Sequence, residues 1–327
     1  MVAHRWNERE KEKTLVSRPT GSPKCPDVPA ATTVFAQARD ENFPVASRLL
    51  PARQREHLLA VYGFARLTDD IGDEATGDRA ALLDWLEAEL ERAGAGTATH
   101  PVLERLTPTI RRLDLPLQPF RDLIEANRVD QRVHRYETFE DLVGYCMLSA
   151  APVGRLVLHL FGAATPERLA RSDEVCIGLQ VVEHLQDVAE DASRGRVYLP
   201  ARDLAVEGCT PADLAAAHAS PALRRVVARE VGRARALLAA GPPLAATLPL
   251  RPRLAVAGFA AGGQAALDAI ERAGYDVLGV RCRPRPGRFG IRLAAAVAAP
   301  FRPGAGADRA DAAPSAAGSP LAAGDRS

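Results

Sequence analysis

The sequence predicts an all-α protein, built as a single helical bundle, and three observations favour this fold class. Between about residues 35 and 285, apolar residues recur with helical spacing almost throughout. Runs that alternate apolar and polar residues, which would indicate half-buried strands, are nearly absent. The chain also lacks a GxGxxG run after a strand and a GxxxxGK run followed by Ser or Thr, so neither a dinucleotide-binding fold nor a P-loop is expected.

The expected helices end at the proline and glycine residues that interrupt this spacing, because these residues favour turns and helix boundaries. In the first half they cover 34–40, 53–74 after Pro51, 78–93 before Gly94, 101–112 and 117–132 on either side of Pro116, and 138–147. In the second half they cover 152–161 before Gly162, 166–192 before Gly195, 211–217 between Pro200 and Pro221, 222–239 before Pro242, and 252–272 after Pro249.

Both ends of the chain differ from this helical part in composition. Residues 1–31 are charged and then rich in Pro, Ser and Gly, without the apolar core of a signal peptide, and residues 303–327 are of low complexity. We expect both tails to be disordered, which leaves one domain over 32–302. No stretch reaches the about 20 apolar residues of a membrane span. We expect the apolar segment 289–301 to be a last helix over the core; a short interfacial membrane helix is the alternative.

The composition argues against several classes of function. The 42 basic and 41 acidic residues give a formal net charge of +1, so no overall field would attract nucleic acid or an anionic membrane. Aromatic residues make up 5% of the chain, which argues against a stacking surface for single-stranded nucleic acid. The cysteines show no CxxC spacing, so we expect a reduced cytoplasmic protein without disulfides or zinc.

Two acidic motifs with the same spacing are the most informative feature of the chain. Asp69 and Asp73 are four residues apart, and Asp187 and Asp191 repeat this spacing. On an α-helix such carboxylates stack on one face, about 6 Å apart along the axis, where they repel each other. A single pair of this kind is usually a solvated helix face. Two pairs indicate a counter-charge, and Mg²⁺ carrying a phosphate-bearing ligand suits an all-oxygen site of this kind.

The residues before each motif favour a buried site. Residues 57–66 and 175–182 are apolar on nearly every helical face, as in helices that are buried on all sides. Acids that end such helices must line something polar inside the protein, because an unpaired buried carboxylate is very costly. The sequence therefore predicts a diphosphate-handling enzyme that uses Mg²⁺ in a central active-site cavity.

An ordered set of motifs resembles the squalene/phytoene synthase family of head-to-head prenyl transferases. The set comprises Arg66 before Asp69 and Asp73, Gln180 before Asp187 and Asp191, the run Arg194-Gly-Arg-Val-Tyr-Leu-Pro200, the segment 144–154, and Tyr275-Asp-Val-Leu followed by Arg281. Together these motifs cover about residues 35–285. The resemblance implies the isoprenoid synthase fold, prenyl diphosphate substrates, and two or three Mg²⁺ ions held by the acids.

The runs 41–47 and 149–154 resemble the bacterial hydroxysqualene synthases of hopanoid pathways. This branch ionises presqualene diphosphate, which a sister enzyme makes from farnesyl diphosphate, and captures the rearranged cation with water, so no NADPH is expected. Two alternatives stay open: a presqualene diphosphate or phytoene synthase, and, as a distant third, a non-catalytic helical assembly factor. Because substrate and product are lipids, peripheral contact with the inner membrane face is a further expectation; nucleic acid is not an expected partner.

The resemblance and the residue types assign roles to the polar site residues. The expected metal ligands are Asp69, Asp73, Glu183, Asp187 and Asp191. Glu183 stands where most of the family has Asn; it can act as an oxygen ligand or repel a nearby diphosphate. The expected polar contacts to substrate are Gln180, Arg66, Arg196 and Arg281. For the arginines, salt bridges to neighbouring acids are the alternative.

The remaining candidates are aromatic and apolar. Tyr145 and Tyr198 are expected to stabilise a carbocation through their ring faces, with a buried and hydrogen-bonded tyrosine as the alternative. The prenyl tails need a dry tunnel, and its expected lining is Phe43, Val153, Leu156, Val157, Leu160, Leu179 and Val182. Plain core packing is the alternative for each lining residue. The histidines match no metal-binding pattern, and His184 is expected to pack.

Overall fold

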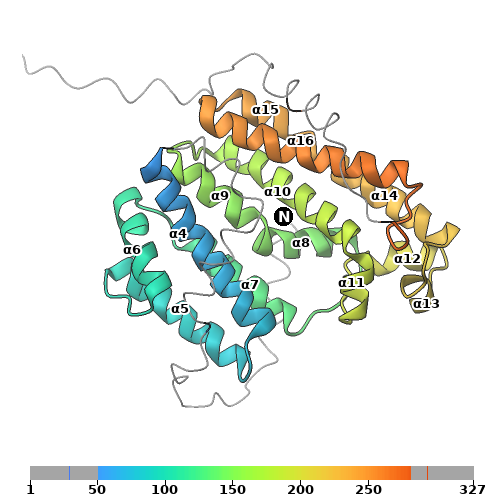
Figure 1. Ribbon diagram of the computed structural model, residues 1–327, viewed down its shortest axis with the longest axis horizontal. Coiled ribbons are helices and arrows are strands. Elements are labelled where there is room, and N and C mark those ends of the chain that lie inside the picture. The colour runs from blue at the N-terminus through green and yellow to red at the C-terminus, as the bar shows by residue number, and fades with distance from the viewer. Residues whose placement is uncertain (1–28, 30–50, 281–292, 294–327) are drawn as a thin grey trace, which may run out of the picture.

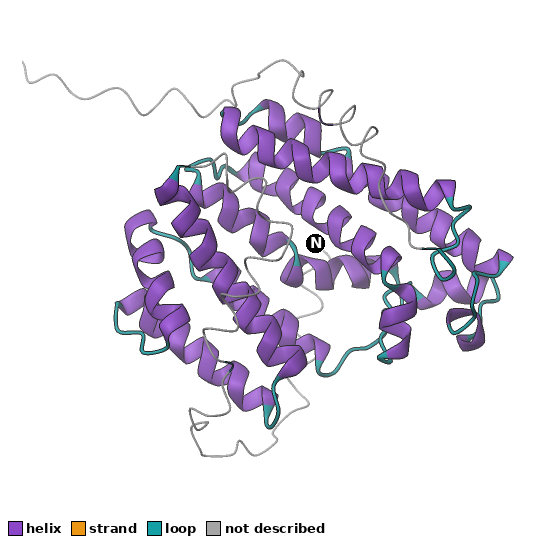
Figure 2. Ribbon diagram, in the orientation of Figure 1, coloured by secondary structure: helices purple, strands orange, loops and turns teal. Residues whose placement is uncertain are grey.

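The computed structural model describes residue 29, residues 51–280 and residue 293 (Figure 1). Over residues 51–280 the chain forms helices joined by turns, and in that range the only extended pairing is an isolated bridge between Arg135 and Val197 (Figure 2). The all-α prediction is confirmed. The predicted helix 34–40, the predicted domain ends at 32 and 302, and the site candidates Phe43 and Arg281 lie outside the described residues.

The helices of residues 51–280 follow one another along the chain, and Figure 1 labels the α-helices among them. They are α4 (Ala52–Asp69), the π-helical turn η2 (Asp70–Glu74), α5 (Arg79–Ala95), α6 (Pro101–Leu113), α7 (Gln118–Asp130), α8 (Phe139–Ser149), α9 (Ala151–Leu160), α10 (Pro166–Gln186), α11 (Val188–Ser193), α12 (Ala201–Val206), α13 (Pro211–Leu214), α14 (Pro221–Leu238), α15 (Gly241–Ala246) and α16 (Leu250–Arg272).

Some predicted breaks are helix starts. Pro200 is the N-cap of α12, and Pro242 lies in the first turn of α15, where a missing N–H costs no intrahelical hydrogen bond. The predicted helix 211–217 ends already at Leu214. The residues that follow instead bring His218 Nδ1 and the Ala219 N–H to the carboxylate of Asp276.

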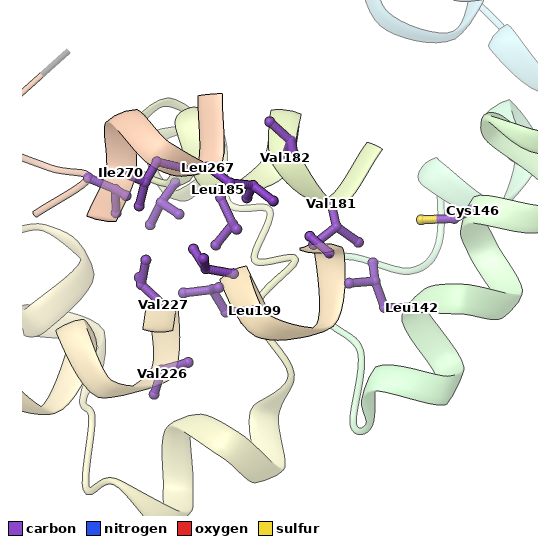
Figure 3. Packing of buried hydrophobic residues seen from close by; sticks show 14 of the residues in the cluster. Leu142, Cys146, Val181, Val182, Leu185, Leu199, Val226, Val227, Leu267 and Ile270 are labelled. Carbon is purple, nitrogen blue, oxygen red and sulfur yellow. The ribbon is translucent and has the colours of Figure 1, made fainter. Parts of the chain in front are cut away.

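Two large hydrophobic clusters form most of the core. One joins α4, α5, α6 and α7, with Leu156 of α9. The other joins α8, α10, α14 and α16, and Figure 3 shows Leu142, Val181, Val227 and Leu267 from these four helices meeting in it. In Figure 1, α10 runs between α4–α7 and α14–α16, and it packs against α8, α9, α14, α15 and α16. Both acidic motifs are therefore carried by helices that the core fixes firmly.

The contact between α9 and α10 depends on a glycine. A Cβ at Gly154 would overlap the hydroxyl of Ser172 and the thiol of Cys176, both on α10. We therefore expect Gly154→Ala to lower the free energy of unfolding by about 2 kcal/mol, as overpacked interiors do. The matched control is Gly232→Ala on α14, where a Cβ meets nothing within 4 Å and alanine should stabilise by about 0.5–1 kcal/mol. Urea denaturation measures both effects, and equal stabilities of the two variants would contradict the prediction.

Candidate active site

The first acidic motif lies where α4 ends in a π-helical turn. Asp69 is the last residue of α4, and Asp73 lies in the turn Asp70–Glu74. Ala75 N donates to Asp70 O at 2.9 Å, which is the i→i+5 hydrogen bond of a π-helix. The two carboxylates therefore do not stack along one regular α-helix, as the spacing predicts, but lie on either side of a helical bulge. Such bulges occur frequently at functional sites.

The second motif lies at a bend, so the predicted helix 166–192 is two helices. α10 ends at Gln186, Asp187 has φ −108° and ψ 13°, and α11 begins at Val188. The helical hydrogen bonds nevertheless continue through the bend: Asp187 N donates to Glu183 O at 3.0 Å, and Asp191 N donates to Asp187 O at 2.8 Å. Glu183, Asp187 and Asp191 therefore still follow one another at helical spacing, but the helix axis bends at Asp187.

An ion pair joins the first motif to the segment that follows the second. Arg196 Nη2 lies 2.8 Å from Asp73 Oδ1, and Arg196 N donates to Asp191 O at 2.9 Å. Gly195 makes the turn between these residues with φ 82°, a left-handed conformation that favours glycine. The fold thus brings together two motifs that are far apart in the sequence, with one guanidinium between them.

The carboxylates of both motifs are held in an environment that disfavours their charge. Burial, with the nearby charge of Asp73, raises the pKa of Asp69 to about 7. Burial, with the charge of Asp187, raises the pKa of Asp191 to about 6 and also raises the pKa of Glu183. Asp69 and Glu183 are nevertheless open to solvent. Both side chains therefore reach solvent while the surrounding protein atoms still disfavour their charge.

This donor set fits a divalent cation. A cation bound among these acids would offset the repulsion and burial that now raise their pKa values. Among residues 51–280, no three His, Cys, Asp or Glu side chains gather closely enough to enclose a metal ion. Mg²⁺ does not need such a cluster, since one or two carboxylates often hold it while waters and substrate phosphates complete the coordination. The metal roles of Asp69, Asp73, Glu183, Asp187 and Asp191 stay predictions.

The two described candidate arginines both form salt bridges. Arg66 Nε lies 2.8 Å from Asp70 Oδ1, and Arg66 Nη2 lies 3.2 Å from Glu74 Oε1, while Arg196 pairs with Asp73. The alternative role expected for these arginines, a salt bridge to a neighbouring acid, is therefore present in the structure. A guanidinium has five N–H donors, so an ion-paired arginine can still donate to a phosphate oxygen. The diphosphate contact of Arg66 and Arg196 stays a prediction.

Beside the acids lies a cluster of four rings, Tyr136, Tyr145, His184 and Tyr198. His184 stacks on Tyr198 with ring centroids 3.7 Å apart, and Tyr145 and Tyr136 lie 5.8 and 5.9 Å from Tyr198. Burial lowers the pKa of His184 to about 3, so its imidazole is neutral; Gln180 Nε2 lies 3.5 Å from its Nε2. Burial raises the pKa of Tyr145 and of Tyr198 above the usual range, so both phenols keep their protons.

Asp130 is a member of this site that the sequence reasoning missed. Tyr145 Oη donates to Asp130 Oδ2 at 2.8 Å, and burial raises the pKa of Asp130 to about 6. The hydrogen bond is the alternative named for a buried tyrosine, and here it also fixes the ring. Asp130 ends α7, an amphipathic helix that carries several charged residues, so the apolar flanks that mark the two acidic motifs are missing here. Neither Asp130 nor Tyr136, in the loop after α7, therefore stands out in the sequence.

Residues 139–160 form α8 and α9 end to end and have the length and composition of a membrane span, so the prediction that no stretch reaches that length is wrong. In the bundle these two helices pack against α7 and α10.

The apolar candidates divide into two groups. Val153 and Val157 on α9, with Leu160 and Leu179, are half-buried, and all of them except Val157 pack against the two clusters described above. Leu156 and Val182 are instead buried in the core, because their helices turn them toward the two clusters described above. Their burial fits the core alternative, and the tunnel role of all these residues stays a prediction.

Known proteins are similar to this chain in sequence and in fold. A hydroxysqualene synthase of Rhodopseudomonas palustris is 40% identical over 214 residues, which cover 64% of this chain and 72% of that protein. A phytoene synthase of Arthrospira platensis is 33% identical and matches 74% of this chain and 83% of its own length. The crystal structure of squalene synthase HpnC from Alicyclobacillus acidocaldarius is 46% identical, with a TM-score of 0.70 over 75% of this chain and 95% of that one.

A dehydrosqualene synthase crystallised with a ligand has a TM-score of 0.72 at 24% identity over 81% of this chain and 96% of that one, a likeness of fold alone. These structures share the isoprenoid synthase fold with the helical bundle seen here. The sequence profile of the squalene/phytoene synthases matches residues 36–288. That range holds both acidic motifs, the ion pair between their segments and the aromatic cluster. The chain therefore belongs to the squalene/phytoene synthase family, and it is an enzyme of the head-to-head prenyl synthase type.

Proposed function

We propose that the protein converts presqualene diphosphate to hydroxysqualene and releases diphosphate, with Mg²⁺ and without NADPH. The observation that carries this proposal is that Arg196 links the two carboxylate motifs, and that the cluster of neutral aromatic rings lies beside them. Acids on one side suit a cation-bound leaving group, and ring faces on the other suit a carbocation. The choice of product is supported by the hydroxysqualene synthases, which match at 40% and 38% identity.

The residues can perform each part of this reaction. The carbon–oxygen bond to the diphosphate breaks with both electrons going to oxygen, and water then adds to the rearranged cation and loses a proton. Bound Mg²⁺ would neutralise the charge that grows on the leaving diphosphate. Asp69, Asp73, Asp187 and Asp191 would hold it, with Glu183 as a further oxygen donor. Arg196 would donate to phosphate oxygens from its place between the motifs.

The aromatic cluster would protect the cationic intermediate. Tyr145 and Tyr198 remain protonated, so they present neutral ring faces, which attract cations. His184 is neutral because of its burial, so it adds no positive charge that would repel a carbocation. The half-buried apolar side chains of α9 would hold the prenyl tails away from water.

A product assay tests the proposal and its alternatives. Purified protein with Mg²⁺ and no NADPH receives presqualene, farnesyl or geranylgeranyl diphosphate in separate reactions, and mass spectrometry identifies the products. Hydroxysqualene from presqualene diphosphate alone is the expected result. Presqualene diphosphate made from farnesyl diphosphate, or phytoene from geranylgeranyl diphosphate, would replace the proposal by the second candidate, which the phytoene synthase match over 83% of that relative favours. The absence of product in every reaction would favour the third alternative, a non-catalytic helical assembly factor.

The same chemistry leads to a proposal on location. A cytoplasmic enzyme with a lipid substrate and a lipid product would work at the inner membrane face, next to a sister enzyme that supplies presqualene diphosphate. Flotation of the protein with liposomes, with and without substrate, measures this contact. Recovery of all the protein in the lipid-free fraction would contradict it.

A further inference from the structure

The last turn of α7 reaches the first acidic motif through two amide side chains. Asn127 Nδ2 donates to Leu123 O at 3.2 Å and to Asp69 Oδ1 at 3.4 Å. Gln131 Nε2 donates to Asn127 O at 3.2 Å and to Gly72 O at 3.0 Å. Each amide thus donates to the carbonyl one turn earlier in its own helix and also to the motif. This double contact fixes the direction of the amide.

A glycine inside the motif makes this approach feasible. A Cβ at Gly72 would overlap Asn127 Oδ1 and lie 2.8 Å from Asn127 Cγ. Gly72 lies in the π-helical turn between Asp69 and Asp73, and both Gly72 and Asn127 are buried. The amide of Asn127 therefore packs against the backbone of the turn itself. Only a residue without a side chain leaves the room for this contact.

An amide donor has a particular effect on a carboxylate. It engages one oxygen by hydrogen bonding and leaves the negative charge in place, whereas an arginine in the same position would compete with a cation. Groups that orient a metal-binding side chain in this way strongly influence metal affinity. Arg196 already neutralises Asp73, so Asp69 is the acid of this motif whose orientation depends on a neutral partner.

We propose that Asn127 and Gln131 are positioning residues, which hold the Gly72 turn and orient the carboxylate of Asp69 for a divalent cation. This inference rests on the proposed function in one respect, namely that Asp69 is a cation ligand. It does not depend on which prenyl diphosphate is the substrate.

The test separates orientation from packing by means of four variants. Asn127→Leu removes the amide but keeps a side chain of similar size. Gly72→Ala forces the amide away, and the double variant Gly72→Ala/Asn127→Ala relieves the overlap without restoring the amide. Gln118→Leu is the matched control, because Gln118 Nε2 donates to Asp122 Oδ1 at 2.7 Å on the exposed first turn of the same helix.

Two measurements are made on each variant: the melting temperature of the protein without metal, and the binding of Mn²⁺, a spectroscopic substitute for Mg²⁺, by electron paramagnetic resonance. Asn127→Leu is expected to weaken Mn²⁺ binding about 10-fold, and to raise the Mg²⁺ concentration for half-maximal rate by a similar factor. Gly72→Ala should weaken binding and lower the melting temperature. The double variant should recover the melting temperature but not the binding, and Gln118→Leu should bind as wild type does.

Wild-type Mn²⁺ affinity in Asn127→Leu and in the double variant would overturn the inference and leave the proposed function intact. Wild-type protein that binds no Mn²⁺ would overturn both. Protein that binds Mn²⁺ with the expected order among the variants, but makes no hydroxysqualene, would support the positioning role and overturn only the proposed product.

Discussion

Replacing Asp69 or Asp187 with asparagine is expected to lower kcat by about 1,000-fold, which would leave almost no turnover. The two residues belong to different motifs, and each would help to hold the cations that neutralise the leaving diphosphate. Asparagine keeps the shape of the side chain but removes the charge, so the loss should fall on ionisation of the substrate rather than on the fold. Steady-state assays with presqualene diphosphate measure the rate, and the far-ultraviolet circular dichroism spectrum should stay that of the wild type.

The control for these variants is an acid in an ion pair away from the site. Asp84 on α5 lies 2.7 Å from Arg128 Nη2 at the surface, so Asp84→Asn removes a paired carboxylate without touching either motif. We expect this variant to keep the wild-type rate, since exposed ion pairs contribute at most about 1 kcal/mol. If Asp69→Asn or Asp187→Asn were as active as Asp84→Asn, the assignment of the motifs to cation binding would be wrong.

The sequence predicts most of the helices because their apolar residues follow the helical period. α14 and α16 begin and end within two residues of the predicted ranges. The helical period predicts helix ends less well, because a proline can either end a helix or begin one. Pro200 and Pro242 interrupt the pattern like helix breakers, yet each begins a short helix because its missing N–H has no partner to lose there. The π-helical turn after Asp69 and the bend at Asp187 change the backbone without changing the spacing of the acids, so the sequence carries no sign of them.

The candidate site, like the fold, has parts that a local sequence pattern predicts and parts that it does not. Its charged members were predictable because acids that end apolar helices are costly without a partner, and this holds for Asp69 and Asp187. The pairing of Asp73 with Arg196, 123 residues later, was not predictable, since no local pattern encodes a contact between distant segments. Asn127 was missed for a similar reason. In the sequence it is one of several polar residues on the amphipathic helix α7, and only its contact with Gly72 gives it a role.

Removing the carboxylate of Asp276 is expected to cause the largest loss of stability. Its Oδ1 accepts the N–H groups of Ala219 at 2.9 Å and Gly279 at 3.0 Å, and its Oδ2 lies 2.9 Å from both Arg224 Nη2 and His218 Nδ1. These partners leave the side chain 6% exposed. Asp276→Ala should lower the free energy of unfolding by about 3 kcal/mol, because it leaves two backbone donors without their acceptor and removes the carboxylate that pairs with the Arg224 guanidinium.

A second variant separates the two oxygens. Asp276→Asn keeps an oxygen for both backbone donors but replaces Oδ2, the partner of Arg224 and His218, with an amide NH2 group, so its cost should be smaller, about 1–2 kcal/mol. Urea denaturation at pH 7 measures both variants. Equal losses would mean that the backbone hydrogen bonds contribute little and that the charge on Asp276 carries the stabilisation.

The stabilisation by this charge should disappear in acid. Burial alone would raise the pKa of Asp276, but the hydrogen bonds from the two backbone groups, His218 and Arg224 hold it well below its usual range. A carboxylate with a depressed folded-state pKa stabilises fully above its unfolded pKa, about 3.9, and loses this effect as the pH falls toward the folded value. The comparison is made in a His218→Gln background, which has no imidazole beside Asp276. There, the difference in free energy of unfolding between the protein with Asp276 and the protein with Asp276→Asn should be constant above about pH 5 and should narrow below about pH 4. A gap that widens in acid would mean that the folded-state pKa of Asp276 lies above its unfolded value, and that its partners do not stabilise the charged carboxylate.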